Sequence, residues 1–191
     1  MHLPAGAPPA PNIIGVTDAD LRCLAYRAKL PGGQVRIVPG NADLLVLWFA
    51  RTFPAYERYW TIEYDVDFSG NWATFFDAFG PHDPTDLLAA TVCRYDDTPA
   101  WRHWGSLVAP PRFRATNRLR CYLPVNRVTR RAVAVISHAY AAGWGGHHEV
   151  AWPTILAMSG LTIGDFGGDG PFVAPQNRNR FYVNNRYDAN L

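Results

Sequence analysis

Segments with the hydrophobic pattern of strands alternate with segments typical of helices along most of this 191-residue chain. Predicted strands cover residues 35–38, 59–68, 86–95, 120–128 and 161–166, and predicted helices cover residues 41–54, 71–79, 129–142 and 153–158. This alternation favours a three-layer α/β/α domain, in which helices cover both faces of one sheet. The ligand crevice of such a domain lies beyond the carboxyl ends of its strands.

Composition narrows the class of protein. Hydrophobic residues make up 48% of the chain and aromatic residues 14%, which is enough to bury a core and excludes wholesale disorder. A net charge of +2 gives no reason to expect nucleic acid as a partner. Residues 1–11 are rich in Pro, Ala and Gly and form a predicted flexible leader, so residues 12–191 form a single predicted domain.

The cysteines and the apolar segments bear on the compartment. Cys23, Cys93 and Cys121 lie far apart and form no Cys-x-x-Cys pair, which favours reduced thiols over a zinc site or a disulfide framework. No signal-peptide pattern and no apolar run of about 20 residues is present. We therefore expect a soluble, cytoplasmic protein without a transmembrane segment.

Residues 60–70 carry the strongest chemical signal. The segment is predicted as a buried strand that ends with Asp65 and Asp67 before the turn at Gly70. Residues two apart on a strand share a face, so both carboxylates point the same way and favour a divalent cation such as Mg²⁺ or Mn²⁺. In the alternative interpretation, Asp65 pairs with a buried arginine and only Asp67 is exposed. Glu63 shares their parity but lies deeper, which favours a structural role.

Four segments together resemble one family. Residues 63–72, 122–130, 146–154 and 167–172 are similar to motifs of bacterial glycosyltransferase-like proteins with the GT-A fold, the fold of nucleotide-sugar transferases. The resemblance extends over roughly residues 35–172, and the order of the motifs is more specific than any one of them. GT-A domains usually begin with a strand and loop that bind the nucleotide, and the short leader before Asn12 suggests an abbreviated N-terminus here.

The resemblance implies a metal-assisted glycosyltransferase. Asp65 and Asp67 would bind Mn²⁺ or Mg²⁺ at the diphosphate of a nucleotide-sugar donor, with His147 as a third metal ligand. Glu149 would be the general base that takes the proton of the acceptor hydroxyl. The alternative for Glu149 is an acid placed in the first turn of a helix by the helix dipole. His147 and His148 are adjacent and would face opposite sides of an extended segment, one buried and one at the surface.

Six further residues are predicted to contact the donor or a glycan or small-molecule acceptor. They are Asn41, Asp43, Arg127, Trp144, His148 and Asp169. Each has an ordinary alternative. Asn41 also suits an N-cap and Asp43 a first-turn acid, most tryptophans belong to a core, and an aspartate among glycines is common in turns.

Two other functions remain open on the sequence. A non-catalytic carbohydrate- or nucleotide-binding relic of the transferase fold is the alternative that the short N-terminus favours. A metal-dependent hydrolase of phosphoesters or glycosides ranks third, because its usual His-x-His cluster is missing from the sequence.

Overall fold

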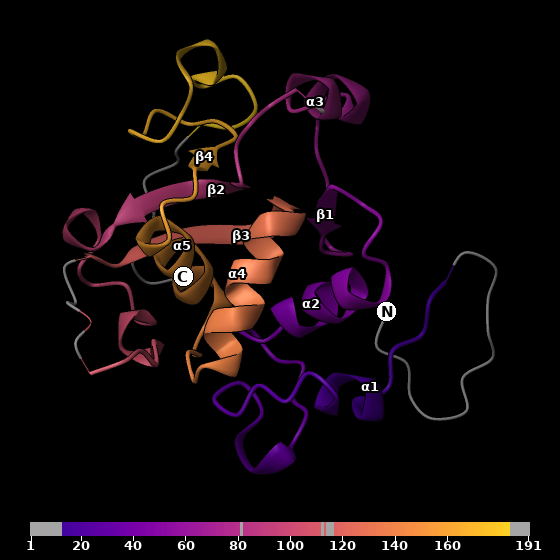
Figure 1. The fold of residues 1–191 in the computed structure, drawn as a ribbon. Helices are drawn as coiled ribbons and strands as arrows, with labels where there is room; N and C mark the ends of the chain where they lie inside the picture. The colour runs from indigo at the N-terminus through magenta and orange to yellow at the C-terminus, as the bar shows by residue number, and fades with distance from the viewer. Residues whose placement is uncertain (1–12, 81, 112, 114–116, 184–191) are drawn as a thin grey trace.

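The computed structural model describes residues 13–80, 82–111, 113 and 117–183. Its centre is a mixed four-stranded sheet of order β1-β3-β2-β4 (Figure 1). The strands are β1 (Arg58–Ile62), β2 (Leu87–Arg94), β3 (Leu119–Thr129) and β4 (Ile163–Asp165). Strand β3 runs antiparallel to both β1 and β2, whereas β4 is parallel to β2. Strands β1, β2 and β4 therefore point in one direction, and their carboxyl ends lie at the same edge of the sheet.

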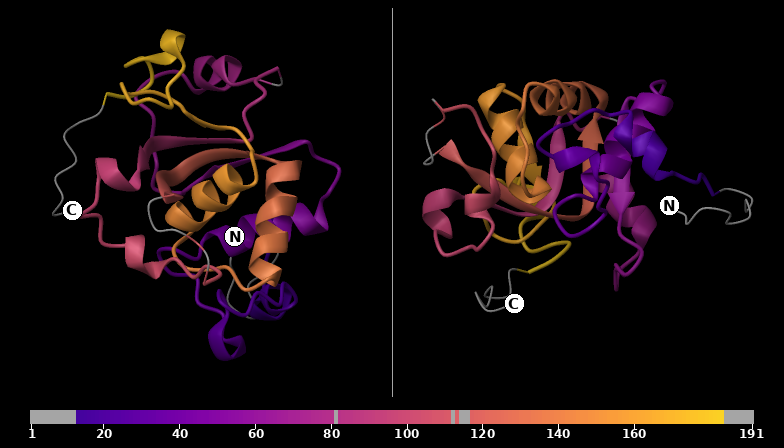
Figure 2. Two further views of the ribbon diagram at one scale, coloured as in Figure 1. Left: turned by 60° about the vertical axis from the view of Figure 1, so that its left-hand side comes forward. Right: turned by 90° about the horizontal axis from the view of Figure 1, so that it is seen from below.

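Five α-helices surround this sheet within the described residues. They are α1 (Asp18–Arg22), α2 (Asp43–Thr52), α3 (Trp72–Ala78), α4 (Arg130–Ala141) and α5 (His148–Met158). Short 3-10 turns occur at Pro31–Gly33, Tyr95–Asp97, Trp104–Ser106 and Pro175–Asn177. Helices α2, α4 and α5 cover one face of the sheet (Figures 1 and 2). On α4 the buried positions Ala132, Val133, Ile136 and Tyr140 recur every three to four residues, as one face of a helix requires.

A second, smaller core lies on the opposite face. On β2, Leu87 and Ala89 belong to the core under α4 and α5, while Leu88 between them packs with Phe75 and Phe79. The alternation follows from the pleat of a strand, whose successive side chains point to opposite faces. Helix α3 and the side chains of Phe166, Phe181 and Tyr182 pack on this second face. The predicted mixed α/β class is confirmed.

The helices predicted at 71–79 and 129–142 are confirmed as α3 and α4. Asn71 caps α3 by accepting hydrogen bonds from the N–H groups of Ala73 and Thr74, and Thr129 caps α4 by accepting one from Ala132. The strands predicted at 86–95, 120–128 and 161–166 correspond to β2, β3 and β4. The predicted leader, residues 1–11, lies outside the described residues.

Three predictions for residues 35–68 are wrong. No strand forms at 35–38, where the chain is irregular, and Asn41 does not cap α2, since its side chain donates to the carbonyl oxygen of Arg36. The acidic strand ends at Ile62 and not at 68. Its last bond runs from the N–H of Glu63 to Pro124, which has no N–H to return. Asp65 and Asp67 thus lie on a loop after β1.

Helix α5 begins five residues earlier than expected, at His148, with Pro153 inside it. A proline within a helix leaves the carbonyl four residues earlier without its usual N–H partner. Here that carbonyl belongs to Glu149, and the thiol of Cys121 on β3 lies 4.0 Å from it. This contact with β3 gives the carbonyl oxygen a weak partner in place of the missing N–H.

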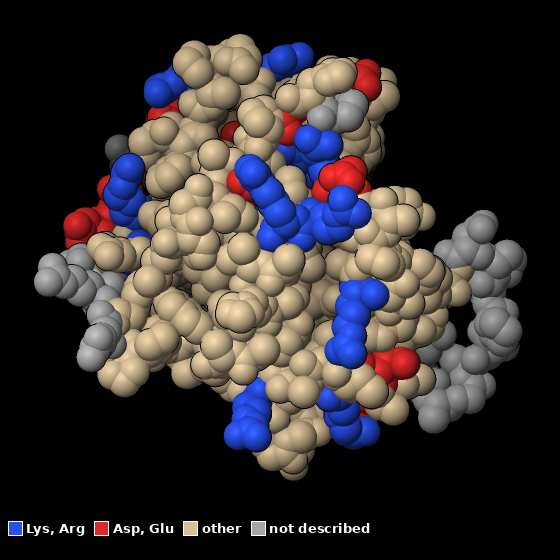
Figure 3. Space-filling model, viewed as in Figure 1, with Lys and Arg blue, Asp and Glu red and all other residues tan. Residues whose placement is uncertain are grey.

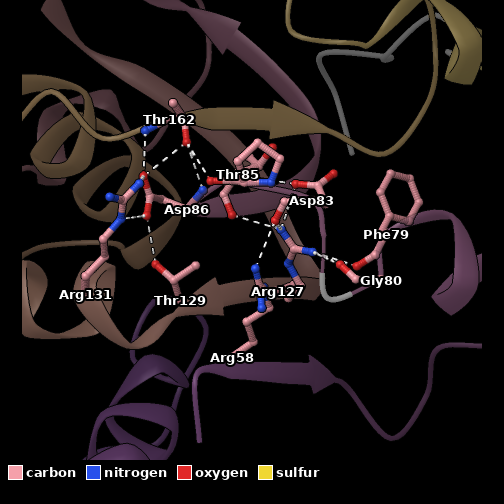
Figure 4. A network of polar contacts seen from close by, with 11 residues as sticks. Arg58, Phe79, Gly80, Asp83, Thr85, Asp86, Arg127, Thr129, Arg131 and Thr162 are labelled. Carbon is pink, nitrogen blue, oxygen red and sulfur yellow. Dashed lines mark hydrogen bonds and ion pairs between the residues drawn. The ribbon is translucent and has the colours of Figure 1, made fainter.

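A polar network fixes the amino end of β2 (Figure 4). The buried carboxylate of Asp86 accepts hydrogen bonds from Arg131 and Thr129 at the start of α4 and from Thr162 before β4. Burial alone would raise the pKa of Asp86, but these donors outweigh it and hold the pKa at about 2. Asp86 thereby ties three elements of the fold together.

Candidate functional site

A cleft of about 1250 Å³ opens at the carboxyl ends of β1 and β2. It is lined by residues of five segments, which lie at 37–46, 61–65, 97–103, 120–126 and 147–152. The first and last of these segments contain the starts of α2 and α5, and the fourth is the first half of β3. This is the edge of the sheet where ligands bind in open α/β folds.

Glu149 lies in the first turn of α5 and faces this cleft. Only 14% of its side chain is exposed, and one carboxylate oxygen lies 3.4 Å from the N–H of Leu123 on β3. Burial raises the pKa of Glu149 to about 7. The Leu123 N–H and the positive charge of Arg120 lower this pKa, whereas the negative charge of Glu63 raises it further. A carboxyl group that titrates near neutrality can accept and return a proton, as a general base or acid must.

Glu63 also lines the cleft, directly after β1. Burial and the nearby Asp65 raise its pKa. Its backbone N–H bonds to Pro124, but in the described part of the chain no group donates a hydrogen bond to its carboxylate. The structural role predicted for Glu63 needed such donors or an arginine, so Glu63 is better described as a second cleft carboxyl group, electrostatically coupled to Glu149.

Three histidine rings form one stack in the wall of the cleft. The centroid of His147 lies 4.3 Å from that of His103 and 5.3 Å from that of His148, with interplanar angles of 24° and 16°. The expectation that His147 and His148 face opposite ways is wrong, because the pair spans the start of α5 and not an extended segment. His103 comes from the loop after β2.

These histidines are neutral at physiological pH. Burial lowers the pKa of His147 to about 3 and that of His148 to about 4. Nδ1 of His147 accepts a hydrogen bond of 3.4 Å from the N–H of Glu149, so this ring caps α5 and carries its proton on Nε2. Although the same Nδ1 lies 3.7 Å from the Glu149 carboxylate, a neutral acceptor forms no ion pair with it.

A buried ion pair holds the starts of α2 and α5 together. The ammonium group of Lys29, the only lysine of the chain, lies 3.0 Å from Asp43 and donates to the carbonyl oxygens of Gly40 and Gly146 at 2.7 and 2.9 Å. Burial lowers the pKa of Lys29, which Asp43 opposes. Tyr140 on α4 donates to the second oxygen of Asp43 at 2.7 Å. Although Asp43 lines the cleft, both of its carboxylate oxygens contact buried partners, Lys29 and Tyr140.

Two glycines allow this close packing. A Cβ on Gly40 would lie 2.6 Å from the ring of His147, and one on Gly146 would lie 2.1 Å from the carbonyl oxygen of Ser106. Gly146 also has a φ of +99°, which L-residues rarely adopt. Both positions thus place the His147 ring between α2 and the loop after β2.

The residues predicted to hold a metal are not brought together. Asp65 lines the cleft at its exposed rim, whereas Asp67 lies outside the lining, and its carboxylate accepts the N–H of Phe68 at 2.8 Å. Within residues 13–183, as far as they are described, no group of three or more His, Cys, Asp or Glu side chains could hold a metal ion. The described residues therefore do not form a ready metal site.

Four predicted substrate contacts lie outside the cleft lining. Arg127 is fully buried, 2.9 Å from Asp83, and donates to the carbonyl oxygens of Phe79 and Thr85 (Figure 4). The other three are Asn41, Trp144, whose ring packs on that of Phe113, and Asp169, which is exposed. His148 and Asp43 do line the cleft.

Sequence reasoning missed several cleft residues. Arg102 comes from the loop after β2, and Arg120 and Tyr122 come from β3. The guanidinium of Arg120 lies 5.3 Å from the centre of the Trp101 ring. Tyr122 is exposed between the buried residues Cys121 and Leu123 of β3. Its place on the other face of a predicted strand is the sequence signal that could have identified it. No local signal identifies the loop residues.

Comparisons with protein-family models, with curated proteins and with solved structures found no match to this chain. In the described part of the chain, none of the helices has the length and the apolar character needed to cross a membrane. Charged side chains are scattered over the face shown in Figure 3, where the surface over α4 and α5 is mostly uncharged. That face carries no broad basic patch in its described part.

Proposed function

We propose that the cleft catalyses glycosyl transfer from a nucleotide-sugar donor to the hydroxyl group of an acceptor, with Glu149 as the general base. The observation that carries this proposal is the position of Glu149, buried in a large cleft with a pKa of about 7. The resemblance of residues 146–154 to the GT-A motif supports it. Membership of that family, a cytoplasmic location and assistance by Mn²⁺ or Mg²⁺ stay predictions.

In a direct displacement, the acceptor oxygen attacks the anomeric carbon of the donor while its proton passes to the Glu149 carboxylate. The bond from the anomeric carbon to the diphosphate breaks, and the nucleoside diphosphate leaves with the electron pair. One oxygen of Glu149 accepts the Leu123 N–H, which orients the other oxygen toward the acceptor. Loss of such a general base slows a reaction about 10²- to 10⁴-fold.

Other cleft groups suit the two substrates. The exposed guanidinium group of Arg102 offers positive charge for a diphosphate. Trp101 and the exposed rings of Tyr64 and Tyr122 offer flat apolar surfaces on which a sugar ring can stack. A volume of about 1250 Å³ exceeds the 300–1,000 Å³ usual for one small ligand, which leaves room for donor and acceptor together.

The test combines binding and turnover. UDP and GDP are titrated into the protein by calorimetry with and without Mn²⁺, and release of nucleotide from their sugar conjugates is then measured. If Asp65 holds the metal as the sequence predicts, Asp65→Ala removes any strengthening of nucleotide binding by Mn²⁺. We expect Glu149→Gln to bind nucleotide normally and to lose at least 100-fold in turnover.

Matched surface variants control for general damage. Glu57 is an exposed glutamate paired with Arg130, and Asp77 is an exposed aspartate on α3, both outside the cleft lining. Glu57→Gln and Asp77→Ala should behave as the wild type. Absence of nucleotide binding by the folded wild type would refute the transferase proposal.

Binding without transfer would favour the second candidate, a non-catalytic carbohydrate- or nucleotide-binding domain. One observation favours that alternative, since Asp65 and Asp67 do not converge on one point of the cleft. Turnover that Glu149→Gln leaves unchanged would remove Glu149 from the mechanism.

A further inference from the structure

Exposed apolar side chains gather around two neighbouring hollows. Ten large hydrophobic residues are exposed in the described part of the chain, and six of them line either the cleft or a second hollow beside it. These six are Ile14, Val38, Tyr56, Ile62, Tyr64 and Tyr122. Apolar side chains exposed in one area, in contrast to single scattered ones, mark a binding surface.

The second hollow, which we call the apolar groove, has a volume of about 510 Å³ and lies between α2 and β1. Its lining consists of Ile14, Val16, Leu45, Val46, Trp48, Phe49, Tyr56, Arg58, Tyr59, Trp60, Thr61 and Ile62. Arg58 is the only charged residue in that lining, and its guanidinium donates to the carbonyl oxygen of Asp83. The groove therefore offers an apolar ligand a surface with almost no charge to desolvate.

The groove adjoins the cleft that contains Glu149. Leu45 and Val46 on α2 and Thr61 and Ile62 on β1 line both hollows. On the cleft side the apolar surface continues over Ile37, Val38 and Pro39. A ligand whose polar end lies near Glu149 can thus extend over Ile62 into the groove without leaving an apolar surface.

We propose that the acceptor of the transfer carries a hydrocarbon chain, which lies in the apolar groove while its hydroxyl-bearing end lies at Glu149. This inference rests on the proposed function. The groove volume of about 510 Å³ suits a small ligand. A protein partner would instead need a surface that buries at least about 1,000 Å² in total. Continuity with the Glu149 cleft favours a chain attached to the substrate.

The test uses alkyl β-D-glucosides of increasing chain length as probes, below the concentrations at which they form micelles. Their binding to the full chain is measured by calorimetry. Each buried methylene should tighten binding about fourfold. Octyl glucoside should therefore bind about 16-fold more tightly than butyl glucoside if two of its four additional methylenes are buried, and about 250-fold more tightly if all four are. Ile62→Ser should weaken octyl glucoside binding about 10-fold and methyl glucoside binding much less, because methyl glucoside has no chain that reaches the groove.

Val108→Ser is the matched control. Val108 is 46% exposed and Ile62 is 41% exposed, but Val108 lines neither hollow. Affinity that does not depend on chain length, or that falls equally in both variants, would overturn the inference. A dimer in sedimentation that dissociates on Ile62→Ser would assign the groove to a second copy of the chain and overturn it too.

The outcomes separate this inference from the proposed function. Nucleotide binding without dependence on chain length would refute the chain-binding groove and leave the transferase proposal standing. Dependence on chain length without nucleotide binding would establish an apolar ligand site and refute the transferase proposal, and with it the role of the chain as part of an acceptor.

Discussion

Replacing Glu149 with glutamine should make the protein more stable at alkaline pH, and the size of the effect follows from the pKa. The side chain has an ordinary pKa of 4.5 when unfolded and about 7 when folded. Between these values the folded state holds a proton that the unfolded state has released, so stability falls as pH rises. The full difference corresponds to about 3.4 kcal/mol, and about 2.5 kcal/mol of it is lost between pH 5 and pH 8.

Glutamine removes this titration and keeps the local contacts. Its amide oxygen can still accept the N–H of Leu123, and its shape matches that of protonated glutamate. Urea unfolding of both proteins at pH 5 and pH 8 gives the measurement. The Glu149→Gln variant should gain about 2.5 kcal/mol over the wild type when the pH is raised from 5 to 8, because all other titrating groups are common to both proteins.

A stability difference that does not change between pH 5 and pH 8 would refute the reasoning. It would mean that Glu149 ionises with an ordinary pKa, in contact with water, and the case for a general base would lose its support. The matched variant Glu57→Gln, at an exposed glutamate, should show no such pH dependence relative to the wild type.

Two further predictions concern the buried charges. Lys29→Met should lower the free energy of unfolding by about 3–5 kcal/mol at pH 7, because it leaves Asp43 buried without its cation, and adding Asp43→Asn should restore part of the loss in urea unfolding. Asp86→Asn should lower it by about 1–2 kcal/mol at pH 7, a value reduced from the full pKa effect because Arg131 is exposed. The pKa of Asp86 is depressed, so its contribution is present above pH 3.8 and is lost as pH falls through about 2. The difference in stability between the variant and the wild type should therefore shrink as the pH falls from about 4 and disappear below pH 2.

The sequence predicted those elements whose ends depend on neighbouring residues. The caps at Asn71 and Thr129 act within three residues, and both helices begin where these caps indicate. The end of β1 could not be predicted in this way, because it depends on Pro124, which is far along the chain and adjacent only in the sheet. Likewise, the weak partner of the Glu149 carbonyl oxygen that Pro153 leaves free, Cys121, lies on another element.

For the candidate site, too, the sequence predicted the types of residue involved but not the contacts between distant segments. Five residues that the sequence analysis selected for their chemical type line the cleft. They are Glu149, Asp65, His147, His148 and Asp43. What the sequence could not provide is burial, and burial is the first cause of the raised pKa of Glu149 and the lowered pKa values of both histidines. Contacts between distant segments set those values.

Lys29, which belongs to no motif, helps to fix the position and burial of Glu149. Its ammonium group holds the carbonyl oxygens of Gly40 and Gly146. Gly40 packs against the ring of His147, and Gly146 directly precedes His147 in the chain. That ring caps α5 through the N–H of Glu149. The position and burial of the candidate base thus depend, through three successive contacts, on a lysine in a turn that no motif includes. The pKa of Glu149 is thus a property of this packing between distant segments, and not of the residues beside Glu149 in the sequence.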